Sequence, residues 1–306
     1  MLCLPFMPVL LVHVLLATAA ALLTLLTCAS GTGDWKDDWI RAWERHAENG
    51  AAWSICQPGQ QRCALPKYVA ARQRNTTAQR IPRVIWQTWS SMDVGARQHA
   101  AMTAWIHDNP EYEYYMFDDQ DAMDFMCSFH ATGRYMHTCT TNSTERSACA
   151  GCSLHMPACS KGAALVYQLL APGAAKADLW RLAIMQRYGG VYMDVDTRPQ
   201  APLRSFIWPD TSMVSGWGAE SDFHQWGLIY APGHPIIETA LRSTVQRVLD
   251  VYQQRKAAPT PWLTGPGALM DGARQAMNND PACREWLAQP LLDNRVVARV
   301  SDMHAA

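Results

Sequence analysis

The first apolar run of the chain extends from Phe6 to Leu26 without a charged residue. As an α-helix rising 1.5 Å per residue, this run would reach roughly 30 Å, the hydrocarbon thickness of a bilayer. The pattern therefore predicts one N-terminal transmembrane helix that acts as a signal anchor. A cleaved secretory signal is the alternative, because residues 28–30 are small, although such signals usually have apolar regions of only about 7 to 15 residues.

The segment after the membrane run has a different pattern. Trp35, Trp39 and Trp43 recur at every fourth position among charged residues, which is typical of an amphipathic helix. Residues from about 51 to 80 show no regular period. We interpret 31–80 as a stem that leads into one folded domain at 81–306.

From residue 81 onward, the apolar positions follow either the strand period of two or the helix period of 3.6. They predict, in chain order, a strand at 83–87, a helix at about 96–107, a strand at 113–117, a helix at 174–188 and a strand at 191–196. Gly189-Gly190 should end the second helix by adopting positive φ. Strands that alternate with helices indicate an α/β fold with a largely parallel sheet and a site at the strands' carboxyl ends.

Composition narrows the classes of partner. The chain has 306 residues, of which 49% are hydrophobic, and a formal net charge of −1. This is enough apolar material for one main domain. Because its Lys and Arg residues are scattered rather than clustered, we expect no nucleic-acid partner.

Two features favour an oxidising lumen for the folded domain. Asn75-Thr76-Thr77 and Asn142-Ser143-Thr144 both fit the N-glycosylation pattern. An even set of eight cysteines lies beyond residue 30, at positions Cys56, Cys63, Cys127, Cys139, Cys149, Cys152, Cys159 and Cys283. Such a set is typical of disulfide bonding outside the cytosol, and the first two are positioned for a local disulfide.

A polar, cysteine-rich insert at about 127–162 interrupts the regular elements. We interpret its five cysteines as mainly disulfide-bonded. A zinc site is the second interpretation; its ligands would be Cys149, Cys152 and Cys159 with His137 or His155. A redox-active Cys149/Cys152 pair is the third, although it needs a following helix that the sequence does not promise.

Asp194 and Asp196 are the strongest candidates for chemistry. They stand at i and i+2 near the end of the last predicted strand, so their carboxylates should share one face with Tyr192. Like charges at this spacing are favourable only with a cation or donor hydroxyls between them. Pure oxygen ligands favour Mn²⁺ or Mg²⁺ over zinc.

Two further polar pairs have contrasting interpretations. Asp178 and Arg181 stand at i and i+3 on the preceding helix and could reach the same cavity, with a surface ion pair as the alternative. Asp119-Gln120-Asp121 repeats the DxD spacing. Because Asp118 and Asp119 stand where a helix N-cap belongs, we expect capping there rather than metal binding.

Two consecutive blocks resemble a known family. The blocks Ala174-Ala175-Lys176-Ala177-Asp178-Leu179-Trp180-Arg181 and Tyr188-Gly189-Gly190-Val191-Tyr192-Met193-Asp194-Val195-Asp196 look like the signature of the DXD-motif sugar transferases of glycosyltransferase family 32. That family includes fungal initiating α-1,6-mannosyltransferases and inositol phosphoceramide mannosyltransferases, and α-1,4-glycosyltransferases carry similar motifs. Further similar segments are 81–89, 109–114, 231–235 and 264–267, so the resemblance covers roughly residues 80–275.

The resemblance implies a fold and an activity. The fold would be a nucleotide-sugar-binding domain of the glycosyltransferase-A type. The reaction would be a retaining, metal-dependent transfer of a hexose to a hydroxyl of a glycan or glycolipid. GDP-mannose is the expected donor, and a UDP-hexose is the second choice. The chain would then be a single-pass type II Golgi membrane protein with a cytoplasmic tail and anchor (1–30), a luminal stem (31–80) and a catalytic domain (81–306).

The resemblance also implies roles for individual residues. Trp86 would lie near the stacked base, and Tyr192 would contact the donor. Asp178 and Arg181 would hold the hydroxyls of the donor sugar. Asp194 and Asp196 would hold ribose, metal and diphosphate.

The chain departs from the family pattern at several points. Ala177 stands where Ser is common, Trp86 stands where many members have His, and the insert at 127–159 is foreign to the pattern. Many relatives have another metal or phosphate contact near their end, for which only Asp302 and His304 are available here.

Two other classes of function remain open at this point. A catalytically silent sugar-binding or scaffold protein of the same fold is the first. A glycoside hydrolase is the second, but its two carboxylates act from separate elements about 5 to 9.5 Å apart and need no nucleotide. Dependence on a nucleotide sugar would separate these classes.

We predict a luminal domain, because N-glycosylation and disulfide bonding both take place on that side. Endoglycosidase treatment of the cellular protein should increase its electrophoretic mobility, and protease added to sealed microsomes should leave the domain intact. Digestion of the domain by outside protease would contradict this topology.

Overall fold

The computed structural model describes residues 56, 60–131, 160–171, 173–216, 223–255, 258–279 and 297–299. No helix within these ranges is long and apolar enough to cross a membrane. The predicted transmembrane helix lies outside the described residues, as do the cysteines of the insert from Cys139 to Cys159, and so do Asp302 and His304.

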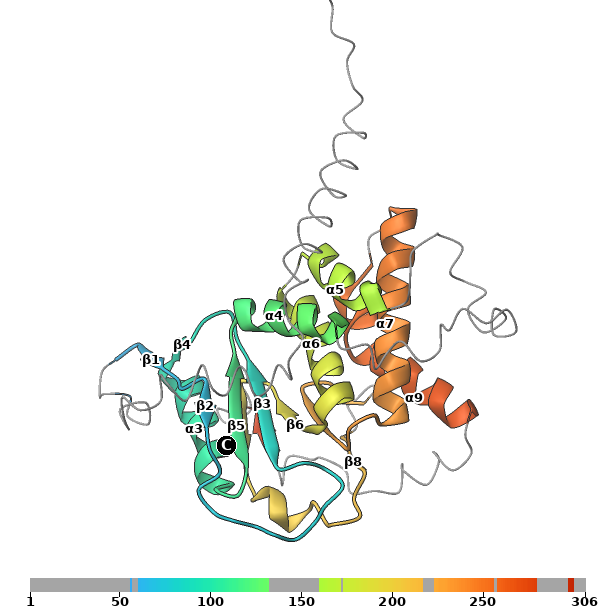
Figure 1. Cartoon of the computed structure of the whole chain (residues 1–306). Coiled ribbons are helices and arrows are strands. Elements are labelled where there is room, and N and C mark those ends of the chain that lie inside the picture. The colour runs from blue at the N-terminus through green and yellow to red at the C-terminus, as the bar shows by residue number, and fades with distance from the viewer. Residues whose placement is uncertain are drawn as a thin grey trace, which may run out of the picture.

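The centre of the fold is a six-stranded sheet with the strand order β2-β5-β3-β6-β9-β8 (Figure 1). Its strands are β2 (Tyr68–Val69), β3 (Val84–Thr88), β5 (Glu113–Phe117), β6 (Gly190–Met193), β8 (Met213–Val214) and β9 (Gly227–Tyr230). Strands β5, β3 and β6 are mutually parallel, whereas β2, β9 and β8 each run antiparallel to their neighbours. The α/β class is confirmed. The expected largely parallel sheet is wrong, because both flanks of the parallel centre are antiparallel.

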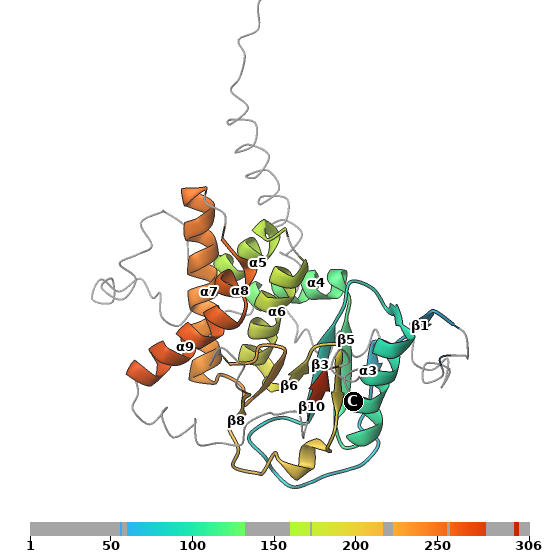
Figure 2. The same ribbon diagram turned by 180° about the vertical axis from the view of Figure 1, so that it is seen from behind.

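Helices cover both faces of this sheet (Figures 1 and 2). One face packs against α3 (Ala96–Asp108). The other face packs against a larger helical layer that contains α4 (Asp119–Ala131), α5 (Ser160–Leu169), α6 (Gly173–Tyr188), α7 (Pro235–Gln254), α8 (Thr260–Leu263) and α9 (Pro266–Asn279). Consecutive strand residues alternate between the layers, so Ile85 packs with α3 and Trp86 packs with α6.

Short elements complete the described part of the chain. They are β1 (Arg62–Ala64), β4 (Asp93–Gly95), β7 (Thr197–Pro199), η4 (Leu203–Ser205) and β10 (Val297–Arg299). β1 pairs with β4, and β2 is an edge strand of the main sheet. The expectation that residues 51–80 are irregular is therefore wrong for 62–64 and 68–69, because these residues find their strand partners far away in sequence.

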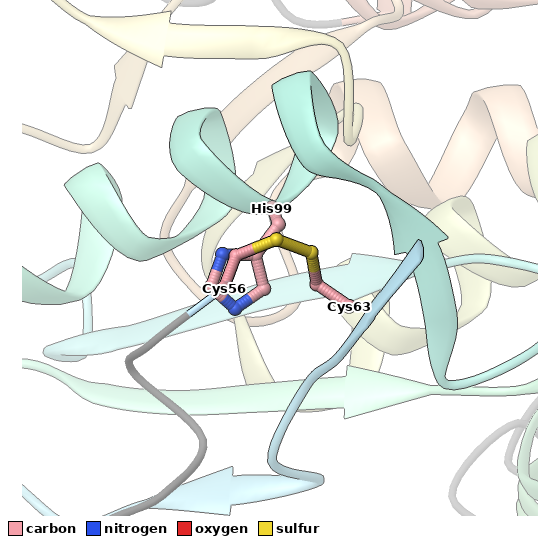
Figure 3. A group of neighbouring side chains, drawn as sticks. All are labelled: Cys56, Cys63 and His99. Carbon is pink, nitrogen blue, oxygen red and sulfur yellow. A yellow bond between two sulfur atoms is a disulfide. The ribbon is translucent and has the colours of Figure 1, made fainter. Parts of the chain in front are cut away.

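Cys56 and Cys63 form a disulfide beside His99 of α3, as Figure 3 shows. This pairing confirms the predicted local disulfide. It fastens residue 56 to β1, which pairs with β4 directly before α3.

The start of α4 confirms the capping interpretation of the second DxD triplet. Asp118 Oδ1 accepts a hydrogen bond from the Asp121 backbone N at 2.9 Å, and Asp121 Oδ2 accepts one from the Asp118 backbone N at 3.1 Å. This reciprocal arrangement satisfies two helix-terminal N–H groups. The Lys67 ammonium lies within 3.0 Å of both carboxylates and balances their charge.

Gly189 and Gly190 reverse the chain between α6 and β6. Their φ values are 61° and 98°, which confirms the predicted positive φ. A Cβ on Gly189 would lie 2.5 Å from Pro232 N, and one on Gly190 would lie 2.5 Å from Val84 Cγ1. Because the reversal is so tight, α6 runs back along β6, and the first half of the helix lies near the carboxyl end of the strand.

The close packing of α7 against α9 depends on Gly272. A Cβ at this position would lie 2.5 Å from the Cα of Ala240. We expect Gly272→Ala to lower the free energy of unfolding by about 1–3 kcal/mol, because the backbone of α7 cannot give way cheaply. Gly173→Ala is the matched control, since its Cβ would meet nothing within 4 Å. The control should be neutral or stabilising by up to about 1 kcal/mol. Denaturant titration would measure both, and unchanged stability of Gly272→Ala would contradict this packing.

Candidate active site

The carboxyl ends of β3, β5 and β6 lie along one edge of the sheet, and the residues that follow them are polar or aromatic. Trp89 comes directly after β3, Asp118 after β5 and Asp194 after β6. Trp89 N donates a hydrogen bond of 3.0 Å to Phe117 O, which ties the first two strand ends together. The edge is where α/β sheets place their ligands, as the sequence predicts.

The DxD triplet forms a turn rather than the end of a strand. β6 ends at Met193, and Thr197 donates to Asp194 O through its backbone N at 3.0 Å and through Oγ1 at 2.6 Å. The predicted strand 191–196 is therefore three residues too long. Asp194 and Asp196 are partly exposed, whereas Val195 between them is buried.

Gln87 holds the beginning of this turn from the neighbouring strand β3. Its Nε2 donates to Met193 O at 3.2 Å and to Asp194 O at 3.3 Å. Its Oε1 accepts a hydrogen bond of 2.8 Å from Tyr114 Oη on β5. All three parallel strands thus contribute to the position of Asp194.

Arg181 of α6 lies between two carboxylates. Its Nη2 is 3.3 Å from Asp178 Oδ1 and 3.3 Å from Asp194 Oδ1. Its guanidinium also stacks over the Tyr192 ring, with Cζ at 4.7 Å from the ring centroid. Tyr192 Oη donates a 2.5 Å hydrogen bond to the same Asp194 oxygen. The structure therefore brings together four of the predicted site residues, Asp178, Arg181, Tyr192 and Asp194.

Burial and neighbouring charges have opposite effects on the pKa values of the residues in this group. Burial alone lowers the pKa of Arg181, but the carboxylates, Asp194 first, outweigh it and raise that pKa. Burial raises the pKa of Asp178, while the charge of Arg181 and a hydrogen bond from Thr264 lower it only in part. Burial also raises the pKa of Tyr192 well above its usual value, so the phenol stays protonated and donates to Asp194.

Trp86 does not fit its predicted role beside the base. Its exposed fraction is 0%, and its indole Nε1 donates to Gly189 O at 2.8 Å. The ring lies among Tyr115, Phe117 and Tyr188 in the core, so it has no free face for a base. Trp89, three residues later, is 41% exposed at the edge of the sheet. Its position two residues after the predicted strand 83–87 was the available signal for this residue.

The donor chemistry around the turn fits a hard divalent cation. Asp194 and Asp196 supply carboxylate oxygens from one turn that is partly open to solvent. Within the described ranges, only Cys56, Cys63 and His99 bring three potential ligand atoms within 4.8 Å of one another. Because the two cysteines are bonded to each other (Figure 3), that group offers no thiolate for a metal. A cation at the Asp194–Asp196 turn would need further oxygens from a ligand or from other parts of the chain.

Two residues of this region were missed by the sequence analysis. Gln225 O accepts a 2.8 Å hydrogen bond from Arg181 Nη1, and Thr264 Oγ1 donates one of 2.8 Å to Asp178 Oδ2. Thr264 belongs to the segment 264–267 that resembles the family, which was a signal of position but not of role. Gln225 carried no signal.

Comparison with known proteins agrees with this site. The model of the family "Glycosyltransferase sugar-binding region containing DXD motif" matches residues 95–223. This range contains Asp178, Arg181 and the Asp194–Asp196 turn. The matched region is therefore similar to that of glycosyltransferases, as expected from the sequence. This match is a similarity to glycosyltransferases with a DXD-containing sugar-binding region, and it covers less than half of the chain.

Two curated relatives are fungal mannosyltransferases. The "Initiation-specific alpha-1,6-mannosyltransferase" of Schizosaccharomyces pombe is 24% identical over 65% of this chain and 49% of its own length. The "Inositol phosphoceramide mannosyltransferase 3" of the same organism is 22% identical over 53% of this chain and 37% of its own length. The chain thus spans half or less of the length of these relatives.

One similar solved structure is described as "PaToxG Glycosyltransferase". It is 16% identical, with a TM-score of 0.45, over 68% of this chain and 74% of that one.

Removing the positive charge of Arg181 should destabilise the fold. Arg181→Leu would leave Asp178 and Asp194 without their shared partner, and we expect the free energy of unfolding to fall by about 3–5 kcal/mol at neutral pH. The deficit should shrink as the pH falls, because burial raises the pKa of Asp178 and the protonated Asp178 no longer repels Asp194.

Arg242→Leu is the matched control, because Arg242 pairs with Glu238 on the exposed side of α7. Its effect should stay within about 0.5 kcal/mol. Denaturant titrations at several pH values would measure both variants. Equal stability of the two would mean that Arg181 is not the structural centre of the site.

Proposed function

We propose that the chain is a retaining, metal-dependent hexosyltransferase. It would move a hexose, with mannose favoured, from a nucleoside-diphosphate sugar to a hydroxyl of a glycan or glycolipid. The names of the two fungal relatives support GDP-mannose as the first donor to test. A UDP-hexose is the second.

The observation that carries this proposal is the meeting of Asp178, Arg181 and Asp194 beside the DxD turn. Asp178 and Arg181 offer an acceptor and a planar donor that suit the hydroxyls of a sugar. Asp194 and Asp196 stand on the solvent side of the same group. A donor that spans from the turn to Asp178 would therefore place its diphosphate and its sugar on different residues, as a glycosyltransferase of the glycosyltransferase-A type requires.

Asp194 and Asp196 are the residues that would hold Mn²⁺ or Mg²⁺. Such an ion would neutralise the charge of the nucleoside-diphosphate leaving group. Arg181 adds a fixed positive charge close to the turn, and Tyr192 holds Asp194 in place through its hydroxyl. Both residues act from the buried side and leave the open side of the turn to the donor.

We assign the base to Trp89 instead of Trp86. Trp89 is an exposed aromatic ring on the same edge of the sheet as Asp194, because the two residues follow the neighbouring strands β3 and β6. A flat ring of this kind stacks on any base. Because such stacking does not distinguish one base from another, the donor screen described below has to identify the base.

The C-terminal residues and the location of the protein remain proposals. β10 pairs with β7, and its Arg299 lies opposite Thr197, directly after the DxD turn. This register supports Asp302 or His304 as an additional metal or phosphate contact. We also retain the proposal of a type II Golgi membrane protein with its domain in the lumen.

The experiment that tests this function is a donor screen. The full chain, purified in detergent, would be incubated with GDP- and UDP-sugars and Mn²⁺, and hydrolysis of each donor would be followed by release of the nucleotide. We expect release from one donor class only, stimulated by the divalent ion. Binding of a donor without any turnover would favour a silent sugar-binding protein, and no binding at all would refute the proposal.

Asp194→Asn and Asp196→Asn should each lose metal-dependent turnover. Asp196→Asn should fold normally, whereas Asp194→Asn also removes one of the two carboxylates paired with the buried Arg181, so its free energy of unfolding should fall. Each substitution keeps the size of the side chain and removes the charge that holds the cation. We expect the rate to fall by a factor of about 1,000 or more. Asp119→Asn, in the capping DxD triplet, is the control and should keep its activity. Near-normal rates in both DxD-turn variants would mean that other carboxylates hold the metal.

A further inference from the structure

Four buried residues form a closed ring of hydrogen bonds and one ion pair behind the candidate site. Asp178 Oδ2 accepts from Thr264 Oγ1, Thr264 O accepts from Gln225 Nε2, and Gln225 O accepts from Arg181 Nη1, each at 2.8 Å. The ring closes between Arg181 Nη2 and Asp178 Oδ1 at 3.3 Å. All four residues are classed among the buried polar groups.

The ring joins three segments that are distant in sequence. Asp178 and Arg181 belong to α6, Gln225 precedes β9, and Thr264 lies between α8 and α9. The backbone there is tight, because a Cβ on Gly265 would lie 2.8 Å from Pro261 Cα. The backbone of Thr264 is therefore held by the chain itself. Its Oγ1 lies 2.8 Å from Asp178 Oδ2 and 3.3 Å from Thr260 O, so the shorter hydrogen bond is the one to Asp178.

The hydrogen bonds of the ring restrict the orientation of the Asp178 carboxylate and of the Arg181 guanidinium. Thr264 occupies one oxygen of the Asp178 carboxylate and Arg181 the other, which fixes the rotation of the carboxylate about its last bond. Gln225 O fixes one nitrogen of the guanidinium. A carboxylate oxygen has more than one acceptor position, so Asp178 keeps capacity for a ligand hydroxyl.

We propose that Thr264 and Gln225 are positioning residues that aim Asp178 and Arg181 at the hydroxyls of the donor sugar. This inference rests on the proposed function and deepens it. Neither residue needs to touch the donor. A group that is held in advance in the orientation required by the transition state lowers the barrier more than it strengthens ground-state binding.

The sharpest test compares Thr264→Val with Thr264→Ser. Val keeps the shape and removes the hydroxyl, whereas Ser keeps the hydroxyl and removes the methyl group. We expect Thr264→Val to lower kcat for the active donor by about 10- to 100-fold, which is the range for a hydrogen bond to a charged group. The Kd for the free nucleoside diphosphate, measured by calorimetry with Mn²⁺, should change by less than about twofold. Thr264→Ser should restore kcat to within about threefold of the wild type.

Thr244→Val is the matched control. Thr244 is fully buried in α7, and its Oγ1 has no hydrogen-bond partner among the described residues. The same loss of a buried hydroxyl should leave kcat unchanged there. If Thr264→Val does not fold, Gln225→Met takes its place, because it removes the donor to Thr264 O while keeping the length of the side chain.

The outcomes separate this inference from the proposed function. A wild-type chain that binds no nucleoside diphosphate refutes the proposed function and this inference with it. A turning-over wild type with a normal Thr264→Val refutes only the inference. It is also refuted if Ser is as damaging as Val, since the methyl contact would then matter, or if nucleotide affinity and kcat fall together.

Discussion

The positive charge of Arg181 is buried, and the protein neutralises it with carboxylates from two different elements. Asp178 comes from the same helix, and Asp194 comes from the turn after β6. A buried guanidinium with one partner removed would cost several kcal/mol, so α6 and the DxD turn have to keep their relative position. The electrostatic requirement that stabilises the fold is thus the same one that assembles the candidate site.

That arrangement depends in turn on the reversal at Gly189 and Gly190. The positive φ of both residues brings α6 directly back onto the sheet, and the contacts at Val84 and Pro232 leave no room for a Cβ. An aromatic layer lies on the buried side of the site and excludes water from it. In this layer, the ring centroids of Phe117 and Trp180 are 4.7 Å apart. Charge pairs in such surroundings interact more strongly than at a surface, which lets a few side chains determine the geometry.

Many of the helices and strands around the site could be predicted from local sequence patterns. Helical and strand periods gave α3, α6, β3 and β5 nearly at their observed bounds, and the glycine pair predicted the reversal. The antiparallel flank could not be predicted, because the direction of β9 is decided by pairing with β6 and leaves no local trace. Trp86 shows a similar limit: its place within a strand indicates a core residue and a site residue equally well, and only its packing decides.

The candidate site also extends beyond residues 95–223, the range that the family model matches. The family match ends at residue 223, yet Gln225 and Thr264, which complete the polar surroundings of Asp178 and Arg181, follow it in sequence. The central strand β3 precedes the match, and through Gln87 it holds the start of the DxD turn. A sugar-binding region cut at the limits of the match would therefore keep its carboxylates but lose the groups that orient them. The segments on both sides of the match are needed, because one motif can supply the charged side chains, whereas their orientation depends on contacts with the rest of the fold.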